Sequence, residues 1–274
     1  MKSDLKTRHG GRILADALAS QGVRIAFGVP GESYLPVLDG LHDLREQIQF
    51  IVCRQEGGAS YMAEAYGKLT GEPGVLFVTR GPGATNGAIG VHTAFQDSTP
   101  VVLFIGQVPN EFAEREAFQE IDYRRMYGQM AKWVAQIDRV ERIPEYVSRA
   151  FHTACAGRPG PVVLALPEDT LFAQAAVADV PKHHTVRPSP SAPEMHEVHR
   201  LLESAQIELR FQGTLQIAFE QQLAREREFR ISEILDADPR HGAKQEHDHA
   251  RYAVAVHHAL EQHMPPACLL LQRS

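Results

Sequence analysis

Apolar residues in the first two-thirds of the chain follow two alternating spacings. In segments such as 59–69 they recur every three or four positions, which is typical of an amphipathic helix. In segments such as 75–78 they form a short unbroken run, which is typical of a strand buried on both faces. The alternation predicts an α/β fold, a parallel sheet with helices packed on both faces. Helices are predicted near 13–18, 35–44, 59–69, 84–97 and 144–156, and strands at 23–29, 50–53, 75–78, 101–105 and 162–166.

The pattern changes after about residue 180. A proline-rich stretch at 181–193 predicts an extended linker, and a short helix is expected at 193–206. Beyond 206 the chain has scattered histidines and few apolar runs, with further helices expected near 215–234 and 250–263. We therefore predict a domain at 1–180, a linker at 181–193 and an atypical C-terminal region at 194–274, mostly helical or disordered.

Composition narrows the classes of function. A net charge of −6 with 23% charged residues argues against a nucleic-acid binder and against disorder of the whole chain. No apolar run approaches the roughly 20 residues that cross a bilayer, and the first ten residues are polar rather than signal-like, so a cytoplasmic protein is expected. The three cysteines are far apart, which predicts neither a disulfide framework nor a zinc site.

Three motifs follow predicted strands, where α/β sheets place functional groups. FGVPG at 27–31 has a plain alternative as a strand-to-helix turn. In RQEGGA at 54–59, Glu56 either favours the start of a helix through its charge or shares a proton with a heterocycle nitrogen in a crevice. TRGPGATN at 79–86 nearly matches a dinucleotide-binding turn, but Asn86 replaces the third glycine and no ribose-binding acid follows the next strand, which disfavours that reading.

Taken in order, these motifs resemble the N-terminal domain of acetolactate synthases, which depend on thiamine diphosphate. AFQDSTPVVLFIGQ, AFQEIDYRRM and RPGPVVLALPED extend the resemblance, which runs from about Gly10 to Asp179. Related decarboxylases and carboligases share most of these segments, whereas the Phe118-Gln119-Glu120 stretch favours the acetolactate synthase branch. The resemblance implies the thiamine-diphosphate-binding fold, with this domain holding the aminopyrimidine of the coenzyme.

The same resemblance implies roles for particular residues. Glu56 would hydrogen-bond N1′ of the aminopyrimidine and act as the proton relay, and Gln119 would lie near the reacting carbon. Phe118 and Lys132 would approach the substrate, although packing explains Phe118 better than chemistry does, and a charged surface position explains Lys132 equally well. Arg80 stands where serine is common in the family. The residues expected along the coenzyme, besides Glu56, are Pro30, Gly31, Thr79, Gly83 and Asn86.

The half of the family's site that holds magnesium and the diphosphate is not evident. Its GDG segment does not occur in this sequence, so we expect no metal site here, with magnesium held by another domain or chain. Asp236 and Asp238 lack the glycine turn, and solvated side chains explain the histidines at 247–263 better than zinc does. Flavin is not expected, because in this family the middle domain mainly binds it.

Two hypotheses about function follow. In the first, the chain is a transferase or decarboxylase subunit that acts on 2-oxo acids such as pyruvate, a step of branched-chain amino acid biosynthesis, and needs a partner chain. In the second, it is a truncated remnant or interaction module that keeps the fold without catalysis. Whether the chain is an enzyme stays open. In either case we expect a homo-oligomer or a complex with the partner chain, and no nucleic acid or membrane.

Overall fold

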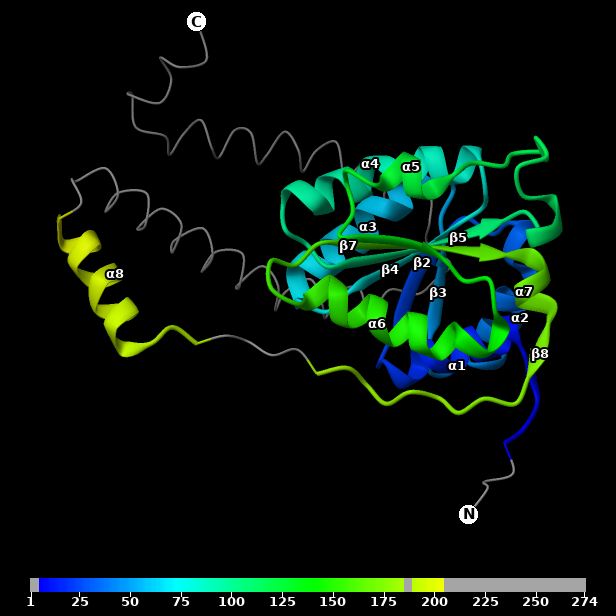
Figure 1. Ribbon diagram of the computed structural model, residues 1–274, viewed down its shortest axis with the longest axis horizontal. Helices are drawn as coiled ribbons and strands as arrows, with labels where there is room; N and C mark the ends of the chain where they lie inside the picture. Colours follow the sequence, from blue (N-terminus) through cyan, green and yellow to red (C-terminus); the bar gives the residue numbers. More distant parts are fainter. Residues whose placement is uncertain (1–4, 185–188, 205–274) are drawn as a thin grey trace, which may run out of the picture. The chain divides into compact units, whose positions relative to one another are not determined.

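The computed structural model describes residues 5–184 and 189–204 (Figure 1). Contacts within the chain divide it into two units, residues 1–189 and 190–274. The first holds the sheet and the helices around it. In the second, the described element is α8 (Ala192–Ser204), close to the helix expected at 193–206. The helices expected near 215–234 and 250–263, both aspartates at 236 and 238, and the histidines at 247–263 lie outside the described residues.

Six parallel strands form the main sheet (Figure 1). From one edge to the other they are β3 (Gln49–Val52), β2 (Ile25–Gly28), β4 (Gly74–Val78), β5 (Val101–Gln107), β7 (Pro161–Pro167) and β6 (Trp133–Gln136). The predicted α/β fold is confirmed, and all five predicted strands are present. The pattern missed β6, because four residues ending in a polar glutamine show no unbroken apolar run. It also missed a two-stranded antiparallel pair, β1 (Arg8–His9) with β8 (Gln174–Ala175).

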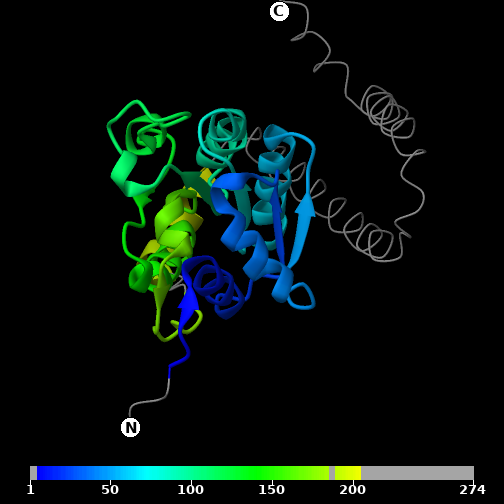
Figure 2. The same ribbon diagram turned by 90° about the vertical axis from the view of Figure 1, so that its right-hand side faces the viewer.

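Helices cover both faces of this sheet, as Figures 1 and 2 show. One face carries α1 (Gly10–Ser20), α2 (Leu35–Asp43) and α6 (Ile143–Cys155), and the other carries α3 (Glu56–Thr70), α4 (Pro82–Gln96) and α5 (Tyr123–Tyr127). A short helix, α7 (Glu168–Phe172), follows β7 directly. Single turns of 3-10 helix lie at Glu32–Tyr34, Asn110–Phe112 and Val140–Arg142.

The core divides into two layers because successive side chains of a strand point to opposite faces. Phe77 of β4 belongs to the cluster with α1, α2 and α6, whereas its neighbours Leu76 and Val78 belong to the cluster with α3 and α4. The ring of Phe77 stacks between Tyr34 and Phe104, with centroids 5.8 and 4.9 Å away. Each such buried ring contributes roughly 1.5 to 3 kcal/mol. Burial on both faces therefore explains the unbroken apolar runs.

Because the strands are parallel, their carboxyl ends all lie on the same side of the sheet, which we call the strand edge. The loops after β2, β3, β4, β5 and β7 consequently meet there, and they carry the three motifs found in the sequence. The opposite edge receives the amino ends of the strands together with the carboxyl ends of α3, α4 and α6. Among the described residues, no helix is both long and apolar enough to span a bilayer.

Candidate functional site

Glu56 is the first residue of α3 and stands directly beyond β3. The residue that caps this helix is its neighbour Gln55, whose side chain accepts a hydrogen bond from the amide of Gly58 at 2.9 Å. Because Gln55 satisfies the helix end, the Glu56 carboxylate turns to another partner. Its Oε2 accepts a hydrogen bond of 3.0 Å from the side-chain amide of Asn86 on α4. The Glu56 side chain is half-buried at the N-terminus of α3.

Two glycines let the turns near this carboxylate pack closely against Thr79. A Cβ atom on Gly83 would lie 2.8 Å from the Cγ2 of Thr79 and 3.4 Å from the Oε1 of Glu56. A Cβ atom on Gly31 would lie 2.7 Å from the Cβ of Thr79. Both approaches are too close for any larger residue without movement. The backbone of both turns therefore lies close to Thr79, with no side chain at either glycine. Bare backbone of this kind suits close contact with a flat ring.

Thr79 links the first and third motifs. Its hydroxyl hydrogen-bonds the hydroxyl of Ser33 at 2.7 Å, which joins the loop after β4 to the loop after β2. Pro30 is exposed and directly precedes Gly31 in that second loop. The structure thus gathers Gly31, Thr79, Gly83, Glu56 and Asn86, with Pro30 adjoining them.

Two buried tyrosines lie next to the glycine turns of this site. Burial raises the pKa of Tyr34, and the nearby Glu56 charge adds to the rise, so its hydroxyl stays protonated and donates to the carbonyl of Val29. Burial also raises the pKa of Tyr123 to about 12. The Tyr123 hydroxyl accepts a hydrogen bond of 3.0 Å from the amide of Gly81. Gly81 has φ +60°, a conformation that favours glycine, and it forms the N-cap of α4.

The loop that follows β5 brings one further expected residue to this edge. A Cβ atom on Gly81 would lie 2.7 Å from the Cβ of Gln119, so Gln119 packs against the turn that starts α4. Gln119 itself adopts φ +65°. Its neighbour Phe118 is 77% exposed and does not pack against the Glu56 region. The structure therefore joins Gln119, but not Phe118, to the loops of the candidate site.

Lys132 lies on the opposite side of the sheet, where the strands begin. It precedes β6, which aligns Trp133 with Val162 at the start of β7. Its ammonium donates to the carbonyl oxygens of Thr153 and Ala156, at 2.5 and 2.6 Å, and so caps the carboxyl end of α6. Burial lowers the pKa of Lys132. The structure does not bring it to Glu56, because the parallel direction of β6 places its amino end at the opposite edge, and the expected approach of Lys132 to the substrate stays a prediction.

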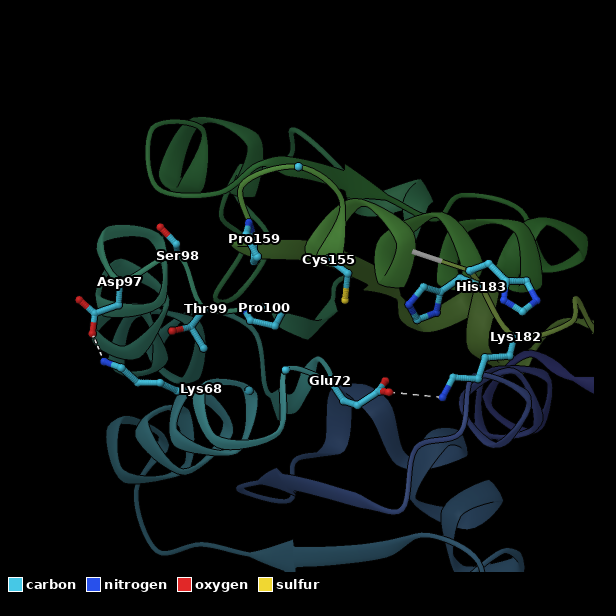
Figure 3. Close-up of a pocket in the computed structure, with 14 residues that line it drawn as sticks. Lys68, Glu72, Asp97, Ser98, Thr99, Pro100, Cys155, Pro159, Lys182 and His183 are labelled. Carbon is cyan, nitrogen blue, oxygen red and sulfur yellow. Dashed lines mark hydrogen bonds and ion pairs between the residues drawn. The ribbon is translucent and has the colours of Figure 1, made fainter. Parts of the chain in front are cut away.

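A pocket of about 610 Å³ also lies at this opposite edge (Figure 3). Its walls carry two ion pairs, one between Lys68 and Asp97 and one between Lys182 and Glu72 at 3.5 Å. Cys155 and His183 line it as well, but none of the residues gathered around Glu56 does. The candidate site is therefore defined by the strand-edge cluster and not by this pocket.

Sequence reasoning missed the supporting groups of the site. Gln55 lies within the motif that contains Glu56, and Ser33 lies two positions after the motif that ends at Gly31, but neither residue nor Tyr123 was assigned a role. Tyr123 could have been found only through its place within AFQEIDYRRM. In the part of the chain that the structure describes, no group of three or more histidine, cysteine, aspartate or glutamate side chains could hold a metal ion.

Comparison with known proteins agrees with this geometry. Residues 8–126 match the family described as the thiamine pyrophosphate enzyme, N-terminal TPP binding domain. This part of the chain is thus similar to a thiamine pyrophosphate enzyme N-terminal domain.

Three relatives illustrate the extent of the similarity. The mitochondrial acetolactate synthase catalytic subunit of Saccharomyces cerevisiae is 41% identical over 164 residues, which cover 60% of this chain and 24% of the relative. The acetolactate synthase large subunit of Lactococcus lactis is 42% identical over 164 residues, 60% of this chain and 28% of the relative. For the isozyme 2 large subunit of Escherichia coli, 36% identity extends over 207 residues, 75% of this chain and 37% of the relative. The chain thus spans about a quarter to somewhat over a third of these relatives.

Proposed function

We propose that this domain binds the aminopyrimidine of thiamine diphosphate, with Glu56 facing N1′ of the ring. The observation that carries the proposal is the half-buried Glu56 carboxylate, which Asn86 holds at 3.0 Å beside the closely packed turn at Gly83. A carboxylate and two close glycine turns suit a flat heterocycle with a basic nitrogen. Thiamine diphosphate, when bound, supplies a nucleophilic carbon and an electron sink for the cleavage of 2-oxo acids.

The residues of this chain would bind, orient and move a proton. Because Asn86 donates to Oε2 of Glu56, the other oxygen, Oε1, is left to hold or release a proton at the ring nitrogen. Gly31 and Thr79 would limit the tilt of the ring from the other side. Gln119 would stand next to the reacting carbon, since it packs against the Gly81 turn. Phe118 would reach the substrate only through a rearrangement or from across an interface.

We further propose that the chain acts on 2-oxo acids such as pyruvate, and that magnesium and the diphosphate are held by another domain or chain. Supporting this, the sequence has no GDG segment, and the described residues offer no cluster of metal ligands. A charge-assisted hydrogen bond contributes roughly 1.5 to 3 kcal/mol, so losing several of them makes the coenzyme bind this chain weakly.

An alternative function is a non-catalytic interaction module. The observation that favours it is the outer face of α3 and α4, where several apolar side chains are about half-exposed. An apolar face of this kind is common at protein–protein interfaces. A module of this type would keep the fold and pair with itself or with a longer relative.

The proposal is tested by titrating the purified chain with 4-amino-5-hydroxymethyl-2-methylpyrimidine, the ring fragment alone, while following amide chemical shifts. We expect a dissociation constant on the order of 1 mM, about −4 kcal/mol, with shifts centred on Gly31 and Gly83. Glu56→Gln should weaken binding at least about tenfold, because the amide cannot share the proton of the ring nitrogen. Glu46→Gln is the control, because its side chain is 90% exposed and distant from the site.

Equal binding by wild-type and Glu56→Gln chains would refute the assignment of Glu56. Catalysis is tested separately by assaying pyruvate consumption with thiamine diphosphate and magnesium, with and without a full-length acetolactate synthase. Activity that appears only in the mixture, and that Glu56→Gln removes, supports the enzyme. If the fragment binds but no mixture shows Glu56-dependent turnover, the interaction module is favoured.

A further inference from the structure

Arg80 is a buried cation at the centre of the strand-edge loops. It follows Thr79 in the loop after β4, and the residue is only 9% exposed. Its Nη2 donates to the Oε1 of Glu32 at 3.1 Å, and its Nη1 lies 3.5 Å from the Oε2 of Glu168. Its charge also acts on Tyr123, opposing the rise that burial causes in the pKa of that hydroxyl. The guanidinium therefore faces two carboxylates and a tyrosine from three other segments.

Those segments are the ones that shape the coenzyme-binding turns. Glu32 directly follows Gly31, so its ion pair with Arg80 ties the loop after β2 to the loop after β4. Glu168 starts α7 at the end of β7 and ties the same loop to the next part of the sheet. On the backbone side, Gly81 is held by the Tyr123 hydroxyl. Arg80 is the one side chain in the described site that connects the Gly31 turn, the Gly81 turn and the end of β7.

The hydrogen-bond arrangement of Arg80 is unfavourable for the stability of the domain. Its Nε and Nη1 are buried and have no hydrogen-bond acceptor among the described residues. A buried charge with unused donors is costly, and apolar residues of similar volume often replace such groups without loss. An arrangement of this kind is better explained by the positions that it imposes on its neighbours.

Direct binding of a substrate carboxylate by Arg80 fits the structure less well. Two glutamates already face the guanidinium, so the group of three carries a net negative charge and repels a further anion. The unused nitrogens are also buried. An anion would have to displace Glu32 and open the loops before it reached them.

We propose that Arg80 is a positioning residue for the aminopyrimidine site. By holding Glu32 and Glu168, it sets the separation between the Gly31 turn and the Gly83 turn, and hence the shape of the surface beside Glu56. The inference rests on the proposed coenzyme function and deepens it, because it names the residue that shapes the binding surface without touching the ring.

The test measures ring-fragment affinity and thermal stability side by side on the whole chain. Arg80→Gln removes the cation, and Glu32→Ala removes its hydrogen-bond acceptor. We expect each to raise the dissociation constant about tenfold, and the double variant to bind no more weakly than the single ones, because both break one interaction. Arg80→Lys should restore part of the affinity, since it keeps the charge but not the planar fork. Because Glu32→Ala takes the hydrogen-bond acceptor from a buried guanidinium, both single variants should lower the melting temperature, and the affinities are therefore compared well below the melting temperature of each variant.

Arg142 and Glu145 form the matched control pair. They make a 2.7 Å ion pair at the start of α6 that involves neither Arg80 nor the residues gathered around Glu56, and Arg142→Gln and Glu145→Ala should leave the affinity unchanged. Wild-type binding that depends on Glu56, together with Arg80→Gln and Glu32→Ala values within twofold of wild type, overturns the role of Arg80 alone. Absence of Glu56-dependent binding in the wild-type chain overturns the coenzyme assignment, and the role of Arg80 with it.

Discussion

At the residue scale, the close packing beside Glu56 depends on a glycine. A Cβ atom on Gly83 would meet Thr79 at 2.8 Å and approach the Glu56 carboxylate at 3.4 Å. We predict that Gly83→Ala destabilises the domain by about 1 to 3 kcal/mol, the usual cost of overpacking, and weakens ring-fragment binding at least about tenfold. Denaturant unfolding and the titration described above measure the two effects separately.

Gly58 provides the matched control on the neighbouring helix. A Cβ atom there would find no atom within 4 Å, and the residue lies in the first turn of α3. Gly58→Ala should therefore be neutral or stabilise the domain by up to about 1 kcal/mol, because alanine loses less backbone entropy in a helix. If the two alanine variants behave alike, the close approach at Gly83 does not limit the site.

Single residues also show what a sequence can and cannot predict here. Glu56 and Gln119 stand in motifs whose order along the chain carries a family resemblance, so their expected places at the strand edge could be written down in advance. Arg80 could not be understood in the same way, because its partners Glu32 and Glu168 are 48 and 88 positions away along the chain. Contacts between residues so far apart in the sequence form only in the folded sheet, so no local sequence pattern predicts them.

At the element scale, β6 decides the position of Lys132. Long apolar segments such as β5 and β7 were predictable because burial on both faces requires an unbroken apolar run. Strand β6 is a short edge strand with one neighbour, β7, and its sequence Trp-Val-Ala-Gln does not distinguish it from a loop. Without that strand, the direction of the chain at Lys132 stayed undetermined, and the residue was assigned to the substrate by resemblance alone.

The capping role of Lys132 leads to a prediction. Lys132→Met keeps the aliphatic stem but loses the hydrogen bonds to Thr153 and Ala156. We expect the domain to lose about 1 to 2 kcal/mol, less than two fully buried charged hydrogen bonds, because the ammonium is only half-buried. Ring-fragment affinity should not change. Chemical denaturation with a parallel titration checks both, and a marked loss of affinity would instead support the substrate role expected from the sequence.

At the scale of the whole molecule, the alternation of helix and strand patterns was sufficient to predict a layered sheet. The reason is that a short apolar run fits only the sheet layer of such a fold, and an amphipathic stripe fits only a helix layer. The motifs then fell at one edge because parallel strands share a direction. The change in composition after residue 180 marks a different region, but composition alone does not determine how such a region packs, and the boundary expected there stays a prediction.

The outer face of α3 and α4 supports a last prediction, about association. Met62 on α3 is 47% exposed and Ile89 on α4 is 53% exposed, on two helices that pack together against the sheet. Tyr61 and Leu69 on α3 add further exposed apolar surface. Exposure of apolar surface to water costs about 25 cal/mol for each Å², so covering this face by a second chain is favoured.

We expect the purified chain to sediment as a dimer or larger species, and Met62→Glu with Ile89→Glu to shift it toward the monomer. Phe172→Glu, at an exposed residue of α7, is the control and should leave the distribution as it is. A wild-type chain that sediments as a monomer at all concentrations contradicts the prediction, and the diphosphate half of the site would then have to come from a chain that recognises another surface.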